Sequence, residues 1–360
     1  MKDRQIRVGI THGDINGIGY EVILKMLEDN RILEMCTPVV YGSAKIAAFY
    51  RKAMEMPNVP MQQTENGEAI RDGVYNIINV VGEDTKVDPG LATPEAGKAA
   101  LAALDRAVDD LKAGNIDVLV TAPINKHSIQ SDEFHFPGHT EYLQDRMGDG
   151  NEALMVLCSD TIRVALVTTH LPISKLPEAI TKEAILNKLN IFNQSLKRDF
   201  GIDSPKIAVL SLNPHAGENG MLGTEENDII IPAIEEAKAH RILAFGPYAA
   251  DGFFGSGSFG KFDGILAMYH DQGLAPFKTL AMDSGVNFTA GLPYVRTSPD
   301  HGTGYDIAGR GLASAESMRS ALYAALDIYR CRLNEDEAHR RPLRRQYYEK
   351  GSDNVVLNLE

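Results

Sequence analysis

Three of the chain's ten histidines share a local setting that suits metal binding. His170 follows the apolar run IRVALVTT, His215 follows KIAVLSLNP, and His270 follows DGILAMY. Each is thus expected at or just beyond the carboxyl end of a buried strand, where ligand sites form in open α/β sheets. Three converging imidazoles would hold a divalent ion and leave coordination positions open, as catalytic sites do. The alternative is three hydrogen-bonded structural residues, because dispersed ligands are not a metal signature by themselves.

Polar residues elsewhere predict groups that bind an anion. His139 and Thr140 stand at a loop-to-helix junction in FPGHTEYL, where the N-terminal amides of a helix attract negative charge. Lys278, Asn287 and Arg296 form a set suited to a phosphate or carboxylate, with the arginine making a two-pronged contact. The alternative is that Lys278 and Arg296 are ordinary surface charges.

Two glycine-rich segments bear on cofactor binding. HGTGYDIAGRG, His301–Gly311, combines dense glycines with Asp306, which lets a backbone wrap closely around a ligand, although simple turn chemistry is the alternative. GSGSFG, Gly255–Gly260, satisfies the GxGxxG pattern, but a strand rather than a helix is expected after it. We therefore assign no Rossmann fingerprint, and the sequence contains no P-loop motif.

The elements that must position these residues alternate along the chain. Strands are predicted at Ile6–Ile10, Pro38–Tyr41, Ile116–Thr121, Ile162–Thr168, Lys206–Leu212 and Gly264–Tyr269. The clearest helix runs from Pro94 to about Lys112, with Thr93 as its N-cap. Because the strands are continuous apolar runs separated by helices, the sequence predicts an α/β fold with a mainly parallel sheet.

Composition restricts the class of protein further. The 360 residues carry a formal charge of −13, which repels phosphate backbones, so no nucleic-acid partner is expected. Neither a signal peptide nor a run of about 18 apolar residues is present, so no membrane partner is expected. Cys36, Cys158 and Cys331 are odd in number and scattered, which favours the reducing cytoplasm. From about Arg332 the chain is dense in charge, and a solvated C-terminal helix and tail are expected.

Taken in order, the motifs resemble those of the 4-hydroxythreonine-4-phosphate dehydrogenase family of pyridoxal phosphate biosynthesis. They are GDxxGIGxE, VTAPINK, FPGHTEYL, TTHLP, LNPHAGE, MYHDQGLAPFK and the HGT…DIAG loop. The resemblance extends from about Arg7 to Arg330. Ile15 and Tyr20 stand where the first motif usually has prolines.

This resemblance implies a two-domain α/β subunit of the isopropylmalate dehydrogenase type, with a cleft between its domains. Residues 1–130 with 285–360 would form the cofactor side, and residues 131–284 the metal, substrate and dimerisation side. An obligate homodimer is implied as well, in which each active site is shared between the subunits.

The resemblance also implies a role for each site residue. The metal ligands are His170, His215 and His270, and the ion is Zn, Co, Mn or Mg. The substrate ligands are His139, Thr140, Lys278, Asn287 and Arg296. The HGT…DIAG loop resembles the cofactor loop of isocitrate and isopropylmalate dehydrogenases, which implies that His301, Gly302, Thr303 and Asp306 bind NAD or NADP.

The implied reaction has two stages. 4-Phosphooxy-L-threonine is oxidised to 2-amino-3-oxo-4-phosphooxybutanoate, which loses carbon dioxide to give 3-amino-2-oxopropyl phosphate in pyridoxine 5′-phosphate biosynthesis. The divalent ion would lower the pKa of the reacting hydroxyl and then polarise the new carbonyl. The group that moves the proton stays open among Lys278, Asp251 and Asp271.

Other functions use some of the same residues. A paralogous dehydrogenase of phospho-threonate or phospho-erythronate would need the same metal and anion groups. A three-histidine metallohydrolase would need no cofactor loop, and an acyl-phosphate transferase of related fold would need no metal histidines. A non-catalytic binding protein would not need so many polar groups at strand ends.

Overall fold

One mixed sheet organises the protein, for which a computed structural model describes residues 4–131, 134–340, 347–348 and 356–357. In spatial order its 12 strands are β3 (Gln62–Thr64), β4 (Asn76–Asn79), β2 (Cys36–Gly42), β1 (Ile6–Thr11), β5 (Val118–Thr121), β12 (Val295–Pro299), β11 (Val286–Ala290), β6 (Leu154–Cys158), β7 (Arg163–Leu166), β10 (Gly264–Ala267), β8 (Lys206–Leu210) and β9 (Leu243–Tyr248). Pairing is antiparallel at β12–β11, β11–β6 and β6–β7, and parallel at the other junctions. The predicted α/β class with a mainly parallel sheet is confirmed.

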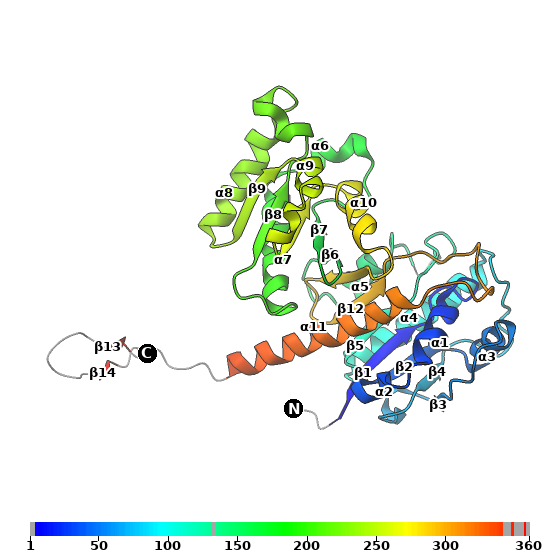
Figure 1. The fold of residues 1–360 in the computed structure, drawn as a ribbon. Coiled ribbons are helices and arrows are strands. Elements are labelled where there is room, and N and C mark those ends of the chain that lie inside the picture. Colours follow the sequence, from blue (N-terminus) through cyan, green and yellow to red (C-terminus); the bar gives the residue numbers. More distant parts are fainter. Residues whose placement is uncertain (1–3, 132–133, 341–346, 349–355, 358–360) are drawn as a thin grey trace.

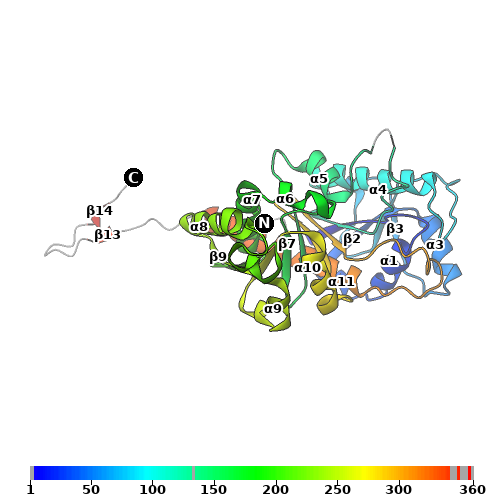
Figure 2. The same cartoon turned by 90° about the horizontal axis from the view of Figure 1, so that it is seen from above.

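Helices cover both faces of this sheet (Figures 1 and 2). The α-helices are α1 (Gly19–Leu27), α2 (Ile32–Met35), α3 (Ala44–Ala53), α4 (Pro94–Lys112), α5 (His139–Met147), α6 (Leu176–Ala179), α7 (Lys182–Arg198), α8 (Ile231–Ala239), α9 (Ala250–Gly255), α10 (His270–Ala281) and α11 (Glu316–Arg340). Short turns of other helix types are η1 (Gly67–Ala69), η2 (Ile173–Lys175), η3 (Pro214–Gly220), η4 (Glu226–Ile230) and η5 (Ser258–Lys261), and a separate pair of strands is β13 (Tyr347–Tyr348) with β14 (Val356–Leu357). None of the helices in the described part of the chain has the length and apolarity that crossing a membrane requires.

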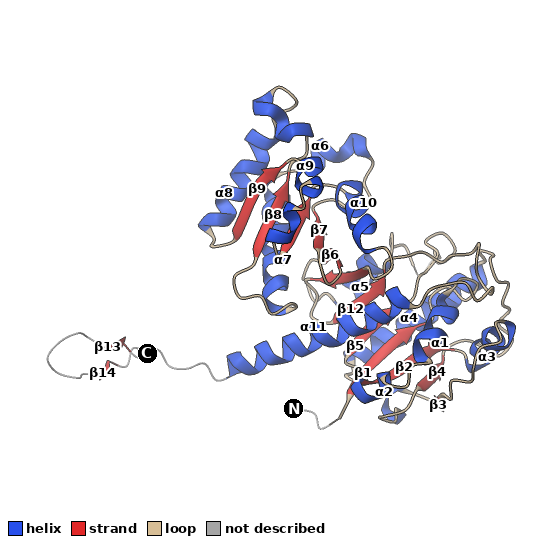
Figure 3. Cartoon of the chain, in the orientation of Figure 1, coloured by secondary structure: helices blue, strands red, loops and turns tan. Residues whose placement is uncertain are grey.

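Buried side chains alternate between two layers. On one face a continuous core joins the sheet to α1, α7, α8 and α11. On the other face α4 and α5 cover the N-terminal half, whereas α9 and α10 cover the second half (Figure 3). In β5, for example, Val118 and Val120 belong to the first layer and Leu119 to the second. Burial on both faces explains why these strands are continuous apolar runs in the sequence.

The antiparallel strands in the middle of the sheet form a seam that reverses its direction. β5 and β12 run one way, whereas β7, β10, β8 and β9 run the opposite way. On the face that carries α5 and α10, the seam strands β12, β11 and β6 therefore separate two parallel halves. The candidate site lies over this seam.

The predicted elements agree closely with the observed ones. The six predicted strands correspond to β1, β2, β5, β7, β8 and β10, and α4 spans Pro94–Lys112 as expected, with Thr93 Oγ1 accepting from Ala96 N at 3.2 Å. The glycine-rich run at 255–260 ends α9 and enters η5, and β10 follows it, so its dismissal as a Rossmann fingerprint is confirmed. The seam strands β6, β11 and β12 were not predicted, because two of them carry polar residues that interrupt the apolar pattern.

The C-terminal helix α11 differs from the prediction at Arg332, the first residue that was expected to be solvated. Arg332 is buried, and its Nε donates to Asp199 Oδ1 at 2.6 Å while Nη1 donates to the carbonyl oxygens of Leu292 and Pro293. The rest of α11 up to Arg340 is largely exposed, as predicted. Most of the predicted tail, at 341–346, 349–355 and 358–360, lies outside the described residues.

Replacing Arg332 with alanine should destabilise the fold strongly. The Asp199 carboxylate would stay buried without its cation, which lowers the free energy of unfolding by about 3–5 kcal/mol. Urea denaturation measures this change. Arg330→Ala is the matched control, because its ion pair with Asp327 lies on the exposed side of the same helix and contributes at most about 1 kcal/mol. Similar small losses in both variants would contradict a stabilising role for the buried pair.

Candidate active site

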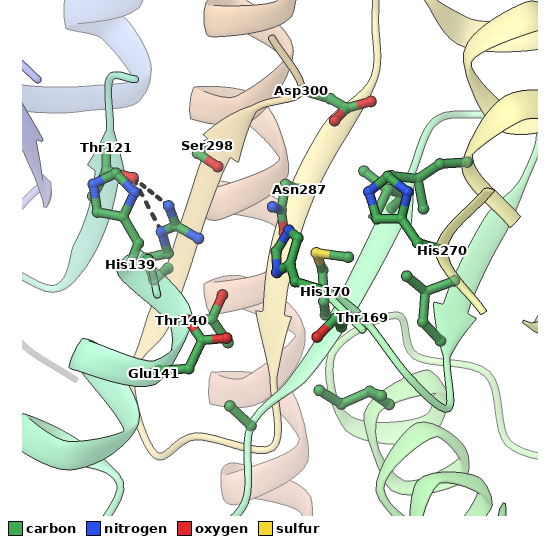
Figure 4. A pocket seen from close by; sticks show the side chains of 18 of the residues that line it. Thr121, His139, Thr140, Glu141, Thr169, His170, His270, Asn287, Ser298 and Asp300 are labelled. Carbon is green, nitrogen blue, oxygen red and sulfur yellow. Dashed lines mark hydrogen bonds between the residues drawn. The ribbon is translucent and has the colours of Figure 1, made fainter. Parts of the chain in front are cut away.

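A cavity of 520 Å³ lies between α5 and α10, over the seam of the sheet (Figure 4). Its volume falls in the range of about 300–1,000 Å³ that is typical of small-molecule sites. Nine of the predicted site residues line it: His139, Thr140, His170, His270, Lys278, Asn287, Arg296, His301 and Gly302. The fold therefore gathers most of the predicted metal and substrate residues into one space.

Two of the three candidate metal ligands are brought together by parallel strand pairing. Leu166 lies opposite Ala267 at the carboxyl ends of β7 and β10, and Val167 N extends the pairing by donating to Ala267 O at 2.9 Å. His170 and His270 follow these paired ends, and their ring centroids are 5.7 Å apart. Strand register thus fixes the spacing of the two imidazoles.

Both rings present nitrogen atoms suited to a cation. His270 Nδ1 lies 2.7 Å from Asp271 Oδ1, which leaves Nε2 for another partner. His170 Nε2 lies 3.1 Å from the ammonium of Lys126. Burial lowers the pKa of His170, the Lys126 charge lowers it further and the Glu141 charge opposes the change, and the net lowering favours a neutral ring whose Nε2 accepts from the ammonium. The donor set therefore fits a divalent ion with imidazole ligands.

His215 lies apart from this pair. It lines a separate and more open hollow of 430 Å³ together with Ala216, Glu218 and Asn219. All four residues have left-handed backbone, with φ between 43° and 59°, a conformation that non-glycine residues adopt only where surrounding contacts impose it. Within residues 4–131 and 134–340, no group of three His, Cys, Asp or Glu side chains is placed to hold an ion.

The carboxylate of Glu226 holds the beginning of the segment that carries His215. Glu226 is buried, and its Oε1 accepts hydrogen bonds from the backbone N–H groups of Leu212 and Asn213, both at 2.8 Å. Its Oε2 accepts from the side-chain amide of Asn213 at 3.0 Å. These bonds fix where the chain leaves β8 and therefore where the left-handed turn starts.

The end of the cavity near α5 carries a buried positive charge. Arg296 is only 2% exposed, and its guanidinium donates to the hydroxyls of Thr121 and Thr289 rather than to a carboxylate. Burial lowers the pKa of Arg296, while the charge of Glu141 raises it. A buried guanidinium held by neutral hydroxyl groups is suited to an anionic ligand.

Several buried polar atoms in the cavity lack a hydrogen-bond partner among the described residues. They are His139 Nε2, Asn287 Oδ1 and His301 Nε2. His139 is the first residue of α5, and burial keeps it neutral by holding its pKa well below the usual value. Because buried polar groups are normally paired in proteins, these atoms indicate that a ligand completes them.

Lys278 lies on α10 at the side of the cavity opposite α5. Its ammonium donates to the carbonyl oxygen of Asp300 at 3.4 Å and lies 3.5 Å from the Asp300 carboxylate. Asp300 is itself fixed, because its backbone N–H donates to Ser317 Oγ at 3.2 Å. Burial raises the pKa of Asp300 and the Lys278 charge opposes that rise.

The predicted cofactor loop packs against the N-terminal glycine-rich turn. Thr303 O accepts from Ile18 N at 2.9 Å, and a Cβ on Gly17 would come within 2.7 Å of the same oxygen, so only glycine fits there. Tyr305 Oη donates to Asp14 Oδ2 at 2.7 Å. His301 and Gly302 line the cavity, whereas Thr303 and Asp306, the latter exposed, do not.

The two predicted proton-transfer aspartates lie outside the cavity lining. Asp251 is exposed on α9, and Asp271 is exposed beside His270. Conversely, sequence reasoning missed Lys126, Glu141 and Asp300, which do line the cavity. Each stands inside a recognised motif or next to one, and each follows the end of a strand or begins a helix at this site.

Together, the mainly parallel α/β fold and a cavity with paired imidazoles and a buried guanidinium suit an enzyme that binds small anionic molecules. The family profile described as "Pyridoxal phosphate biosynthetic protein PdxA" matches residues 34–325. The chain belongs to this family of dehydrogenases, which confirms the resemblance drawn from its motifs.

Individual relatives agree with this assignment. The 4-hydroxythreonine-4-phosphate dehydrogenase of Bacteroides thetaiotaomicron is 57% identical over 364 residues, covering 100% of this chain and 99% of the relative. A putative D-threonate 4-phosphate dehydrogenase of Oceanobacillus iheyensis is 37% identical, covering 89% and 97%. The crystal structure of the 4-hydroxythreonine-4-phosphate dehydrogenase of Klebsiella pneumoniae matches with a TM-score of 0.79 at 32% identity, covering 90% of this chain and 100% of that one.

Removing the Glu226 carboxylate should loosen the segment that carries His215. In Glu226→Ala the backbone N–H groups of Leu212 and Asn213 lose their acceptor, and the free energy of unfolding should fall by about 2–4 kcal/mol. Chemical denaturation measures the loss, and Glu226→Gln, which keeps an acceptor, should lose less. Glu235→Gln is the control, because its pair with Lys238 is exposed. An alanine variant as stable as that control would refute the bracing role.

Proposed function

We propose that this protein oxidises 4-phosphooxy-L-threonine with NAD⁺ or NADP⁺ to 2-amino-3-oxo-4-phosphooxybutanoate. Loss of carbon dioxide then gives 3-amino-2-oxopropyl phosphate, for pyridoxine 5′-phosphate biosynthesis. The observation that carries the proposal is one cavity that joins a buried guanidinium to two adjacent imidazoles. The guanidinium suits a doubly anionic substrate, and the two imidazoles suit a divalent ion that activates an alcohol.

In this proposal the cavity binds the substrate at both ends. Arg296, with His139 and Thr140 at the start of α5, binds one anionic group, because a helix N-terminus adds unpaired N–H donors to the guanidinium. Lys278 and Asn287 bind the opposite end. The orphaned Asn287 Oδ1 and His139 Nε2 would each gain a partner from the bound substrate.

We assign the divalent ion, which is Zn, Co, Mn or Mg, to His170 and His270, with His215 as the third ligand. When bound, it supplies Lewis-acid chemistry at the reacting oxygen. Since His215 lies in a separate hollow of its own chain, we propose that the third imidazole is His215 of the partner subunit in a homodimer. Asp271 orients His270 through its Nδ1.

Proton transfer falls to Lys278 in this scheme. Of the three candidates it is the one that lines the cavity, because Asp251 and Asp271 lie outside the lining. The carboxylate and carbonyl of Asp300 hold its ammonium. When the bond to the leaving carboxylate breaks, its electron pair stays on the substrate carbon, and Lys278 Nζ is placed to donate a proton there.

The cofactor side is proposed to comprise residues 1–130 with 285–360, and the metal and substrate side residues 131–284. NAD or NADP bound at His301, Gly302, Thr303 and Asp306 supplies the hydride acceptor. The contact of Thr303 with Ile18 and of Tyr305 with Asp14 supports a loop held in a fixed position for this purpose. The free thiols of Cys36, Cys158 and Cys331 support action in the cytoplasm.

A second candidate is oxidation of a phosphorylated 2-hydroxy acid such as D-threonate 4-phosphate. The Oceanobacillus relative bears that name at 37% identity. The anion and metal residues proposed above serve either substrate equally, so only the group on the substrate's second carbon separates the two.

The assay that tests the proposal is NAD(P)H formation from 4-phosphooxy-L-threonine. The purified protein should reduce one of the two cofactors, lose that activity on chelation, and regain it with at least one of Zn, Co, Mn or Mg. Activity that persists in metal-free protein would exclude the metal assignment. No reduction of either cofactor under any ion would exclude the dehydrogenase proposal for this substrate.

If each metal site takes His215 from the partner subunit, two inactive variants should complement each other in a mixed dimer. His170→Ala and His215→Ala variants should each be inactive, because each lacks one proposed ligand in both sites. Co-expressed with different tags, they should form mixed dimers with one intact site, giving about a quarter of the wild-type activity in a random mixture. Purified mixed dimers without activity would show that His215 does not act across the interface. Thermal unfolding of each single-variant dimer, measured in parallel, is the control for correct folding.

A further inference from the structure

Among the residues that the structure describes, three carboxylates line the cavity, and they differ in what they contact. Glu152 is paired with the ammonium of Lys188, and Asp300 holds Lys278. Glu141, the third residue of α5, has neither a hydrogen bond nor an ion pair among the residues that the structure describes. Glu141 is therefore the one carboxylate of these three without a direct ion-pair partner, although its charge acts at longer range on Arg296 and His170.

The Glu141 carboxylate points into the substrate space rather than away from it. Figure 4 shows Glu141 beside Thr140, directed into the cavity between His139 and His170. Gly138, the N-cap of α5, lies close to the carboxylate, because a Cβ at that position would be in ordinary van der Waals contact with Glu141 Oε2 at 3.6 Å. The carboxylate therefore borders the groups that are proposed to bind the substrate.

A negative charge without a direct ion-pair partner at this place opposes the binding of an anion. Substrates with a phosphate and a carboxylate would be repelled by Glu141 unless they also carry a positive group that meets it. The substrate proposed above carries one such group, the α-ammonium, whereas the matching 2-hydroxy acid carries none. Glu141 thus discriminates between these two classes by charge.

We propose that Glu141 binds the α-ammonium of the substrate and determines the preference for a 2-amino acid over the matching 2-hydroxy acid. This inference rests on the proposed dehydrogenase function and specifies its substrate class. A charge-assisted hydrogen bond between carboxylate and ammonium stabilises the amino substrate, whereas the hydroxy acid would leave the half-buried carboxylate without a direct ion-pair partner.

A purely structural role for Glu141 makes a different prediction. In the first turn of α5 a carboxylate can stabilise the helix dipole or bond back to the N-cap N–H. Among the described residues, Glu141 accepts no hydrogen bond from the N–H of the N-cap residue Gly138. Gly138 itself has no side chain that could cap the helix. If the role were structural, neutralising Glu141 would lower thermal stability and would affect the turnover of both substrates alike.

The test compares Glu141→Gln with wild-type holoenzyme on two substrates, 4-phosphooxy-L-threonine and the 4-phosphate of the corresponding 2-hydroxy acid. Loss of the charge should lower kcat/KM for the amino acid by about ten- to a hundredfold. The kcat/KM for the hydroxy acid should stay the same or rise, so the ratio of kcat/KM for the amino acid to that for the hydroxy acid should fall strongly. Most of the loss should appear in KM, and Glu141→Asp, which keeps the charge, should recover part of the ratio.

Glu152→Gln is the matched control, because it removes a charge from the same cavity, and the ammonium of Lys188 already balances that charge. Its ratio between the substrates should match the wild type. Equal falls for both substrates in Glu141→Gln, or no change in either, would overturn the role of Glu141. Wild-type holoenzyme that prefers the hydroxy acid would overturn it too, whereas wild-type protein that reduces no cofactor with either substrate would overturn the proposed function itself.

Discussion

Parallel pairing of β7 with β10 is the constraint from which the rest of the site follows. The register aligns the two carboxyl ends, so the residues that leave them start side by side and bring His170 next to His270. A shift of one residue would turn alternate side chains to the other face and separate the rings. The cores on both faces of these strands resist such a shift, because it would expose apolar side chains that are now buried.

Charge balance in the cavity depends on the seam. The antiparallel strands β12, β11 and β6 place Arg296 and Asn287 between two parallel halves, on the face that carries α5 and α10. There, the guanidinium is desolvated but bonded only to hydroxyl groups, and the charge of Glu141 acts on it from nearby. The cavity therefore carries charges of both signs, which a uniformly basic pocket would not.

Much of the fold could be predicted because its signals are local. Each buried parallel strand is a continuous apolar run, and Thr93 and Pro94 mark the start of α4 by their capping chemistry. The seam strands β11 and β12 escaped prediction because Asn287 and Arg296 interrupt their apolar pattern, and both of these polar side chains line the cavity. Arg332 escaped for a related reason, since burial of an arginine depends on a distant partner, Asp199.

By itself, the sequence determined the α/β class, the family and nine of the residues that line the cavity, because strand ends and motifs are properties of short segments. Only the tertiary structure decided which of them meet. It brought His170 to His270, left His215 in another hollow, and showed that Asp300 and Lys126 contact the predicted residues. These outcomes depend on strand order and on the path of a left-handed turn, which long-range packing sets and local spacing does not encode.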